Sequence, residues 1–456
     1  MSLPGRFEPR APWAGRALHF VGLGGAGMSG LALVAHALGA RVTGSDRADS
    51  AYLERVRAAG IEPALGHDAA HLPPGDDAEV VISTAIPSDN PERDAARERG
   101  LPELHRGELL AQVSSMKRCI AVAGTHGKTT TASMAVHALL CCDMDPAYLI
   151  GGELRSTGVN AAWGEGEWVV GEADESDRSF LRLRPELAVV TNVELDHHAT
   201  YASRTEVEDA FADFLRAVHR PILWDAPEAE ALLDRAGVGE AAFFRADDVE
   251  LGPDGSTFIW AEQRVRLAVP GAHNVANAAA ALTACVLAGA PAERLAGALE
   301  DFRGVGRRFE RLGMTPSGAE VIDDYAHHPT EVAATLAAAR TLAPRRLVAV
   351  FQPHLYSRTE RLYREFGAAL ARADVVAVLD VYPARERARD HPGVSGRLVA
   401  AAAADAAPGR MVLWLPALDT AEAVLAPRLR EGDLCLVLGA GDVDRLGRAL
   451  VGRERS

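Results

Sequence analysis

This chain has few aromatic residues and few cysteines, and it has fewer positive than negative charges. Phe, Trp and Tyr make up 5% of its 456 residues, whereas 48% of the residues are hydrophobic. A composition poor in aromatics and rich in alanine suits layered α/β structure. The net charge of −15 argues against a surface that binds nucleic acid or an anionic membrane.

The sequence also lacks signals for secretion or membrane insertion. Its five cysteines lie in apolar segments without metal-type spacing, which predicts buried free thiols in a reducing compartment. No signal peptide and no apolar run of spanning length is visible. We therefore expect a cytoplasmic protein of roughly two to four domains.

A glycine-rich loop at Gly124–Thr129 is the segment around which the chain is organised. The apolar run Cys119–Ala123 precedes it, and an alanine-rich helical pattern follows it. A strand, a glycine loop and a helix place backbone N–H groups and a positive helix end around phosphate. Lys128 would neutralise the β- and γ-phosphates of a nucleotide, and the Thr129 hydroxyl would bind Mg²⁺. Because Val122 replaces the first glycine of the common pattern, the loop is a shorter variant.

A second glycine turn lies near the N-terminus, where an apolar strand runs into Gly22, Gly24 and Gly27. A helical pattern and a strand ending at Asp46 complete a dinucleotide-binding pattern. Taken alone, this pattern predicts NAD, but a nucleotide-sugar would also place a pyrophosphate at the helix and a hydroxyl near the acid. A later strand ends in Ser83–Ala85, at the sheet edge where ligands bind.

Two strands of the middle region end in acidic residues. Trp168–Asp177 is an apolar strand that runs into four carboxylates, and Leu187–His198 is a strand followed by two acids and two histidines. Parallel strands present their carboxyl ends at one edge of a sheet. Hard oxygen ligands there suit Mg²⁺. The sequence therefore predicts a metal and phosphate site beside the glycine loop.

Polar residues also gather at later helix starts and strand ends. His273, Asn274 and Asn277 open an alanine-rich helix, and their side chains suit the edge of a nucleobase, although Asn at a helix start is often only a cap. In the last third, Val321–Glu331 and Leu347–Thr359 each read as a strand followed by a polar turn and a helix start.

Other segments carry structural signals. We expect an amphipathic helix at 205–219 and a β-hairpin at Thr257–Leu267. His67 and His71 fall between predicted elements and are expected to be solvated loop side chains. Lys128 is likewise expected to be exposed in its loop.

These motifs together resemble the Mur ligase family over nearly the whole chain, from Gly22 to Asp442. The stretches that carry the resemblance are GLGGAGMSG, GSD, STAIP, GTHGKTTT, GGEL, EADESD, NVELDHH, HNVANAAAA, RRFE, DDYAHHPTE, FQPHLYSRT and LGAGD. The resemblance implies an α/β protein of three domains. A Rossmann-like UDP-sugar domain would span 1–113, a P-loop-type ATPase domain with a mostly parallel sheet 114–303, and a Rossmann-like amino-acid domain 304–456.

The resemblance implies an ADP-forming ligase of peptidoglycan precursor synthesis, and so a part in cell-wall biogenesis, cell shape and cell division. It would join L-alanine to the carboxylate of UDP-N-acetylmuramate through an acyl phosphate, using ATP and Mg²⁺. No nucleic-acid or membrane partner is expected, and the protein would be a monomer or a homodimer. The glycine turn at Gly22–Gly27 would then hold the UDP-sugar.

The resemblance also assigns residues to contacts. Those expected to bind ATP are Gly124, Thr125, His126, Gly127, Lys128, Thr129, Thr130, His273, Asn274, Asn277 and Arg308. Those expected to bind the UDP-sugar are Gly22, Gly24, Gly25, Ala26, Gly27, Met28, Ser29, Asp46, Ser83, Thr84 and Ala85. Those expected to bind the amino acid are Tyr325, His327, His354 and Arg358, and those expected to bind the metal are Thr129, Glu172 and His197. The residues expected to act in catalysis are Lys128, His327 as a candidate base for the amine, and Arg358 as a fork for the alanine carboxylate.

Two positions depart from the family pattern. Leu355 stands where the family usually has arginine, and Ala199 stands where it usually has an acid. Three alternatives stay open: a recycling ligase that attaches a preformed tripeptide to the same UDP-sugar, an NAD-dependent oxidoreductase built on Gly22–Asp46, and a catalytically silent UDP-sugar sensor. The intact Lys128 and Glu172 argue against the silent sensor.

Overall fold

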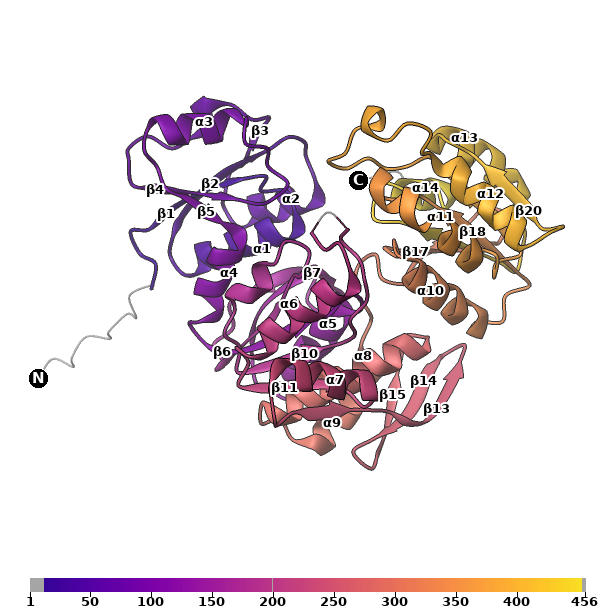
Figure 1. Cartoon of the computed structure of the whole chain (residues 1–456), viewed down its shortest axis with the longest axis horizontal. Coiled ribbons are helices and arrows are strands. Elements are labelled where there is room, and N and C mark those ends of the chain that lie inside the picture. The colour runs from indigo at the N-terminus through magenta and orange to yellow at the C-terminus, as the bar shows by residue number, and fades with distance from the viewer. Residues whose placement is uncertain (1–11, 199, 453–456) are drawn as a thin grey trace, which may run out of the picture.

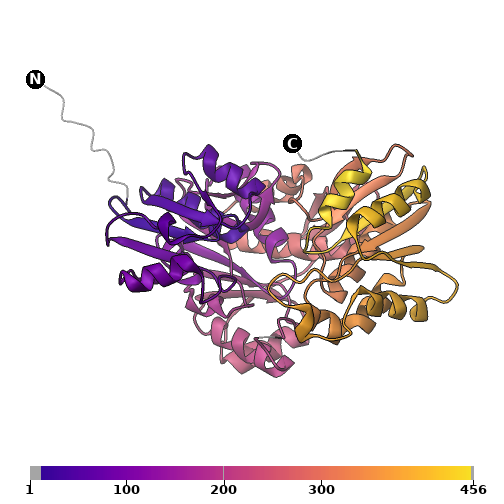
Figure 2. The ribbon, with the colours of Figure 1, turned by 90° about the horizontal axis from the view of Figure 1, so that it is seen from above.

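A computed structural model describes residues 12–198 and 200–452 of the chain, so Ala199 lies outside the described residues. Three α/β units follow one another along the sequence (Figure 1). The first and last units lie on opposite sides of the molecule, and the middle unit lies between them (Figure 2). The expected three-domain α/β fold is confirmed, whereas the exact boundaries stay predictions.

The first unit is built on a five-stranded parallel sheet with the strand order β3-β2-β1-β4-β5. The strands are β1 (Ala17–Val21), β2 (Arg41–Asp46), β3 (Ala64–Leu65), β4 (Ala78–Ile82) and β5 (Glu103–His105). The helices are α1 (Ala26–Ala37), α2 (Ala51–Ala58), α3 (Pro91–Glu98) and α4 (Arg106–Ser114). The predicted strand, glycine turn and helix are therefore present, with α1 beginning directly after the turn.

A buried carboxylate corrects the expectation for the two loop histidines. Glu92 is fully buried and lies 2.7 Å from His19 Nε2, 2.8 Å from His67 Nδ1 and 2.6 Å from the Ser45 hydroxyl. His71 Nδ1 lies 4.0 Å from the same carboxylate. An ionised carboxylate in an apolar interior needs such partners, and therefore the loop histidines face inward. The solvated interpretation was wrong.

The middle unit is built on a seven-stranded sheet with the order β12-β11-β10-β6-β9-β7-β8, and of its described pairs only β7 with β8 is antiparallel. Its strands are β6 (Arg118–Ala123), β7 (Ala147–Leu154), β8 (Val159–Ala162), β9 (Trp168–Glu172), β10 (Leu187–Val190), β11 (Arg220–Trp224) and β12 (Ala242–Phe244). Its helices are α5 (Lys128–Cys141), α6 (Arg204–Leu215), α7 (Pro227–Ala236), α8 (Ala272–Leu287) and α9 (Ala292–Ala298). The predicted hairpin is confirmed as β14 (Gly255–Trp260) and β15 (Gln263–Leu267), to which β13 (Asp247–Gly252) adds a third antiparallel strand.

The last unit is built on a six-stranded sheet with the order β16-β17-β21-β18-β19-β20. Its strands are β16 (Glu310–Met314), β17 (Glu320–Asp324), β18 (Arg346–Phe351), β19 (Val375–Val378), β20 (Met411–Trp414) and β21 (Asp433–Leu438). Its helices are α10 (Pro329–Thr341), α11 (Tyr356–Leu370), α12 (Gly396–Ala406), α13 (Leu418–Leu425) and α14 (Asp444–Leu450). In the register, Leu438 pairs with both Asp324 and Phe351, so the polar turns after β17 and β18 emerge at one sheet edge.

Small side chains set the packing beneath the glycine loop. Helices α5 and α8 pack against each other, and both bury alanines, among them Ala135 and Ala280. Side chains this small let two helices approach closely, which explains how a chain poor in aromatics fills this core. The packing also brings the start of α8 to the start of α5, where the Thr131 hydroxyl lies 3.2 Å from Asn277 Oδ1.

Four of the five cysteines are buried, as expected, but Cys141 is exposed at the end of α5. All five are free thiols. Among the described residues, no helix is both long enough and apolar enough to cross a bilayer.

Candidate active site

The glycine loop joins β6 to α5 and has the geometry that the motif predicts. Gly124 and Gly127 have φ values of 128° and 82°, a region that favours glycine. A Cβ atom on Gly124 would collide with the Thr191 hydroxyl, and one on Gly127 would collide with the Asn277 amide. The loop is held by the segment that follows β10, the neighbour of β6 in the sheet, since the His126 N–H donates to Asn192 Oδ1 at 2.9 Å.

Lys128 points inward rather than into solvent. Its ammonium donates to Glu175 Oε2 at 2.7 Å and to the Gly124 carbonyl at 2.5 Å, and its side chain is only 16% exposed. The expectation of an exposed lysine was therefore wrong. Burial alone would lower the pKa of Lys128, but Glu175 and Asp174 raise it above its usual value, so the ammonium stays charged.

Two of the three expected metal ligands lie together. The Thr129 hydroxyl donates to Glu172 Oε2 at 3.0 Å, and a Cβ atom on Gly151 would fall 3.0 Å from Glu172 Oε1. Burial raises the pKa of Glu172, which marks a carboxylate short of positive charge. His197 instead faces Glu175, with 3.1 Å between Nε2 and Oε1. Glu175, one acid of a predicted run, thus contacts both Lys128 and His197.

A cavity of about 220 Å³ opens beside the loop, between the middle and last units. The expected ATP residues that line it are His126, Gly127, Thr130, His273, Asn274, Asn277 and Arg308. Its apolar wall was not foreseen and consists of Phe244, Val269, Phe302, Val305 and Phe309. Apolar walls with a few polar groups suit a flat aromatic base.

The polar groups at the start of α8 are partly engaged within the protein. Asn274 Nδ2 donates to the Pro270 carbonyl at 2.7 Å, and Asn277 Nδ2 donates to Asn274 Oδ1 at 3.4 Å. Burial lowers the pKa of His273 to about 4, so its imidazole is neutral near pH 7. Neither asparagine caps α8, because its N-cap residue is Gly271 and no side chain of the described residues bonds the free N–H groups there, so the capping interpretation was wrong. Both asparagines face the cavity.

The N-terminal glycine turn is tied down by the predicted acid. Gly24 N–H donates to Asp46 Oδ2 at 2.7 Å, so in this structure Asp46 supports the turn itself. Met28 and Ser29 lie in α1 with buried side chains, which leaves only backbone groups for a ligand. Ser83–Ala85 follow β4 at the same sheet edge, in a turn closed by the Ile86 N–H and the Ser83 carbonyl at 3.1 Å.

Arg106 was missed by the sequence reasoning. Its guanidinium lies 2.6 Å from Asp174 and 3.1 Å from Asp177, and a Cβ on Gly27 would lie 3.4 Å from it. Burial would raise the pKa of Asp174, but Arg106 and Lys128 hold it well below its usual range. A single arginine at a helix start carries no sequence signal for this link between the first and middle units.

Arg358 makes a different contact from the one expected. Its Nε and Nη2 atoms lie 3.1 Å and 3.0 Å from Asp196 Oδ1, and Nη2 is 3.1 Å from Oδ2. Both side chains are buried, and this charge-assisted pair joins α11 of the last unit to the segment after β10. The fork assigned to the alanine carboxylate is therefore held by Asp196 in this structure.

The other expected amino-acid contacts form a row of rings. Tyr325 and His327 have centroids 5.4 Å apart, His327 and His354 6.0 Å apart, and His354 stacks on Tyr382 at 5.8 Å. Burial lowers the pKa of His327 to about 4 and that of His354 to about 3. His327 Nδ1 lies 2.9 Å from the Tyr325 carbonyl, so Nδ1 carries the proton and Nε2 is the basic nitrogen.

Leu355, where the family usually has arginine, is buried at the start of α11. It has a φ of 70° and is 8% exposed, and its N–H donates to the Tyr382 carbonyl at 2.9 Å. A substitution here must therefore fit a left-handed backbone conformation as well as a buried side-chain position.

Known proteins match the chain along nearly its whole length. Three family models match in order: "Mur ligase family, catalytic domain" at residues 17–118, "Mur ligase middle domain" at 122–285 and "Mur ligase, glutamate ligase domain" at 307–441. A UDP-N-acetylmuramate–L-alanine ligase of Streptomyces griseus is 46% identical, over 96% of this chain and 97% of its own. A ligase of the same name from Acidithiobacillus ferrooxidans is 45% identical, over 94% of this chain and 96% of its own.

Solved structures agree with these matches. The UDP-N-acetylmuramate–alanine ligase of Thermotoga maritima superposes with a TM-score of 0.82 at 29% identity, over 96% of this chain and 98% of that one. A murein peptide ligase of Psychrobacter arcticus superposes with a TM-score of 0.73 at 25% identity, over 97% of this chain and 100% of that one. The chain belongs to the Mur ligase family.

Proposed function

We propose that this Mur ligase joins L-alanine to the carboxylate of UDP-N-acetylmuramate and converts ATP to ADP and phosphate. Relatives named for this reaction align over nearly the full chain at 45–46% identity. The structural observation that carries the proposal is the cavity beside the glycine loop, because the middle and last units both line it. ATP bound there would lie near the ring row proposed to receive the amino acid, because Asp324 and Glu331, on either side of Tyr325 and His327 in the chain, line the cavity.

The chemistry explains why so many charged groups meet at the loop. A carboxylate is a poor acylating agent, so its oxygen attacks the γ-phosphorus of ATP, the bond to the bridging oxygen breaks, and ADP leaves. The amine of alanine then attacks the acyl carbon, loses a proton and displaces phosphate. Lys128 offsets the negative charge that gathers at the γ-phosphate when it moves from Glu175 to the phosphate.

Thr129 and Glu172 fit a magnesium ion. A hydroxyl and a carboxylate oxygen 3.0 Å apart are hard donors of the kind that Mg²⁺ prefers, and the half-buried Glu172 has a raised pKa that a cation would lower again. The bound ion would supply positive charge against the phosphates. His197 joins this pair only if it leaves Glu175.

His327 is the proposed acceptor of the amine proton. Its imidazole is neutral near pH 7, and the Tyr325 carbonyl fixes the proton on Nδ1, which leaves Nε2 free to accept another. Arg358 is proposed to exchange Asp196 for the alanine carboxylate when the amino acid binds.

The remaining assignments are part of the same proposal. The glycine turn of the first unit would bind the UDP-sugar, and the three domains would span 1–113, 114–303 and 304–456. The protein would act in the cytoplasm as a monomer or homodimer, in the pathway that supplies peptidoglycan precursors and so supports cell shape and division.

A phosphate-release assay tests the proposed reaction. The protein is incubated with ATP, MgCl₂ and UDP-N-acetylmuramate, and each of L-alanine, glycine, L-serine and the murein tripeptide is added in turn. We expect release that depends on both the UDP-sugar and L-alanine. Release with the tripeptide and none with alanine would make this a recycling ligase. NADH binding without ATP turnover would reject the ligase function.

A further inference from the structure

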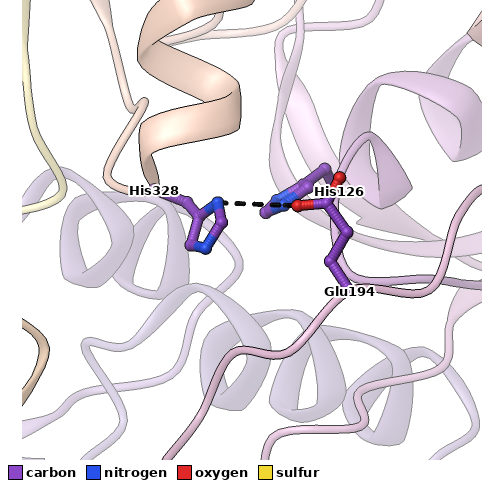
Figure 3. A group of neighbouring side chains, drawn as sticks. All are labelled: His126, Glu194 and His328. Carbon is purple, nitrogen blue, oxygen red and sulfur yellow. Dashed lines mark hydrogen bonds and ion pairs between the residues drawn. The ribbon is translucent and has the colours of Figure 1, made fainter. Parts of the chain in front are cut away.

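A second cluster of ligand-type side chains lies apart from Thr129 and Glu172. His126 comes from the glycine loop, Glu194 from the segment after β10, and His328 from the residue before α10, so the cluster spans the middle and last units (Figure 3). Among the described residues, it is the one group of three or more His, Cys, Asp or Glu that could hold a metal ion, and its ligand atoms all lie within 4.8 Å of one another.

The spacing of these atoms is close to that of a tetrahedral metal centre. His126 Nε2 lies 3.3 Å and His328 Nδ1 lies 3.9 Å from the same oxygen, Glu194 Oε2. Bonds of about 2.0–2.2 Å to Zn²⁺ leave ligand atoms about 3.3 Å apart. The first pair already has this spacing, and the second needs a shift of roughly half an ångström. The two histidine nitrogens lie within 4.8 Å of each other, so the side chains must also draw together for an ion to bind.

Neighbouring groups orient these ligands. Glu331 Oε1 lies 3.3 Å from His126 Nδ1, and a carboxylate on the far nitrogen is the usual support of a metal-binding histidine. The Thr330 hydroxyl donates to Glu194 Oε2 at 2.8 Å, which steadies the carboxylate. His328 Nδ1 accepts only a long 3.4 Å bond from the Thr330 N–H, and Glu194 is 38% exposed, which gives an ion a path from solvent.

We propose that His126, Glu194 and His328 bind a borderline-soft divalent transition metal ion, represented by Zn²⁺, with water as the fourth ligand. Two imidazoles and one carboxylate favour such an ion over Mg²⁺, so this site differs in chemistry from the Thr129–Glu172 pair. The ion ties the last unit to the glycine loop and occupies the wall of the nucleotide cavity, which His126 and Glu194 line. It therefore inhibits ATP turnover. This inhibition rests on the proposed function, whereas the binding of the metal ion to the three side chains does not depend on that function.

Cobalt substitution tests the site directly. Co²⁺ is added to the full-length protein without Mg²⁺ or nucleotide, and the visible absorption of tetrahedral Co²⁺ is followed and then displaced with Zn²⁺. We expect one ion per chain. His328→Asn removes the imidazole but keeps a side chain that caps helices well, and it should weaken binding about 100-fold. Glu331→Gln should weaken it about tenfold.

Three matched controls should leave the cobalt band unchanged. His36→Asn removes an exposed histidine in the last turn of α1, Cys141→Ser removes the exposed thiol, and Glu172→Gln alters the proposed magnesium pair. If no tetrahedral band develops, or if His328→Asn and Glu194→Gln both bind as the wild type does, the cluster is only an ion-pair network and the proposal is overturned.

Zinc inhibition of phosphate release gives the second readout. Zn²⁺ should inhibit the wild type at concentrations about 100-fold lower than those needed for His328→Asn, at the same excess of Mg²⁺. Inhibition that is equal in both proteins would place the inhibitory ion elsewhere. Cobalt binding without any turnover, even in the absence of Zn²⁺, would reject the proposed function and leave the metal site intact.

Discussion

Lys128 and Glu175 form an ion pair at the point where the γ-phosphate of a nucleotide would arrive. Their charged atoms lie 2.7 Å apart, and the side chain of Glu175 is 2% exposed. A buried carboxylate that loses its cation is strongly destabilising, so this lysine stabilises the folded state in addition to its proposed role in the reaction. The stabilising role and the proposed catalytic role can be tested separately, because a bound phosphate would compete with Glu175 for Lys128 but would not itself contact the glutamate.

Replacing Lys128 tests both roles. Lys128→Met should lower the rate of phosphate release by roughly 100- to 1000-fold and also lower the unfolding midpoint, because Glu175 loses its ammonium partner. The double variant Lys128→Met/Glu175→Gln should regain stability but not activity. Near-normal release by Lys128→Met would show that another group neutralises the γ-phosphate.

At the scale of elements, the turn between β6 and α5 depends on a neighbouring helix. Gly127 has a φ of 82°, and the place of its missing Cβ is taken by Asn277 of α8. The turn between β6 and α5 thus packs directly against Asn277, which lies more than a hundred residues further along the sequence.

Alanine substitution measures this fit. Gly127→Ala should reduce unfolding stability by about 1–3 kcal/mol and abolish ATP turnover, since both the backbone and the Asn277 side chain must shift. Gly297→Ala is the matched control, because nothing lies within 4 Å of a Cβ there and alanine favours the helix α9. Equal effects of the two changes in urea denaturation and phosphate release would contradict this account.

The sequence predicted elements far better than it predicted contacts. Apolar runs followed by glycine located β1, β6 and their helices, because local patterning decides those structures. It did not show that Asp196 would hold Arg358, which lies 162 residues further along the chain. Nor did it show that Glu92 would turn His67 inward. Charge pairs between residues that are distant in the sequence depend on how the sheets and the three units pack together, and a local sequence pattern does not predict that packing.

At the scale of the whole molecule, charged side chains connect the three units. His126 of the middle unit lies 3.3 Å from Glu194 of its own unit and 3.3 Å from Glu331 of the last unit. Burial would lower the pKa of His126, but the two carboxylates raise it to about 9. In the metal-free folded protein the histidine therefore stays protonated at pH values where the unfolded chain has lost the proton, and a metal ion at Nε2 would have to displace that proton.

This difference predicts how stability depends on pH. A histidine with a raised pKa contributes stability that is fully present below about pH 6.5 and is lost as pH rises through about 9. In EDTA, the unfolding free energy should fall between pH 6.5 and 9, by about 3 kcal/mol at most from this residue. His126→Asn should flatten that fall in urea denaturation. An identical slope in the variant would remove His126 as the cause.

The place of β21 in the last sheet has a consequence for synthesis. This strand, Asp433–Leu438, is the last strand along the described residues, yet it lies between β17 and β18 in the sheet. The first unit is complete once its contiguous residues have left the ribosome, whereas the last sheet cannot close until Asp433–Leu438 has left it as well. A nascent chain that stalls before Asp433 would carry two folded units and a third with a vacant centre, exposing unpaired strand edges to other chains.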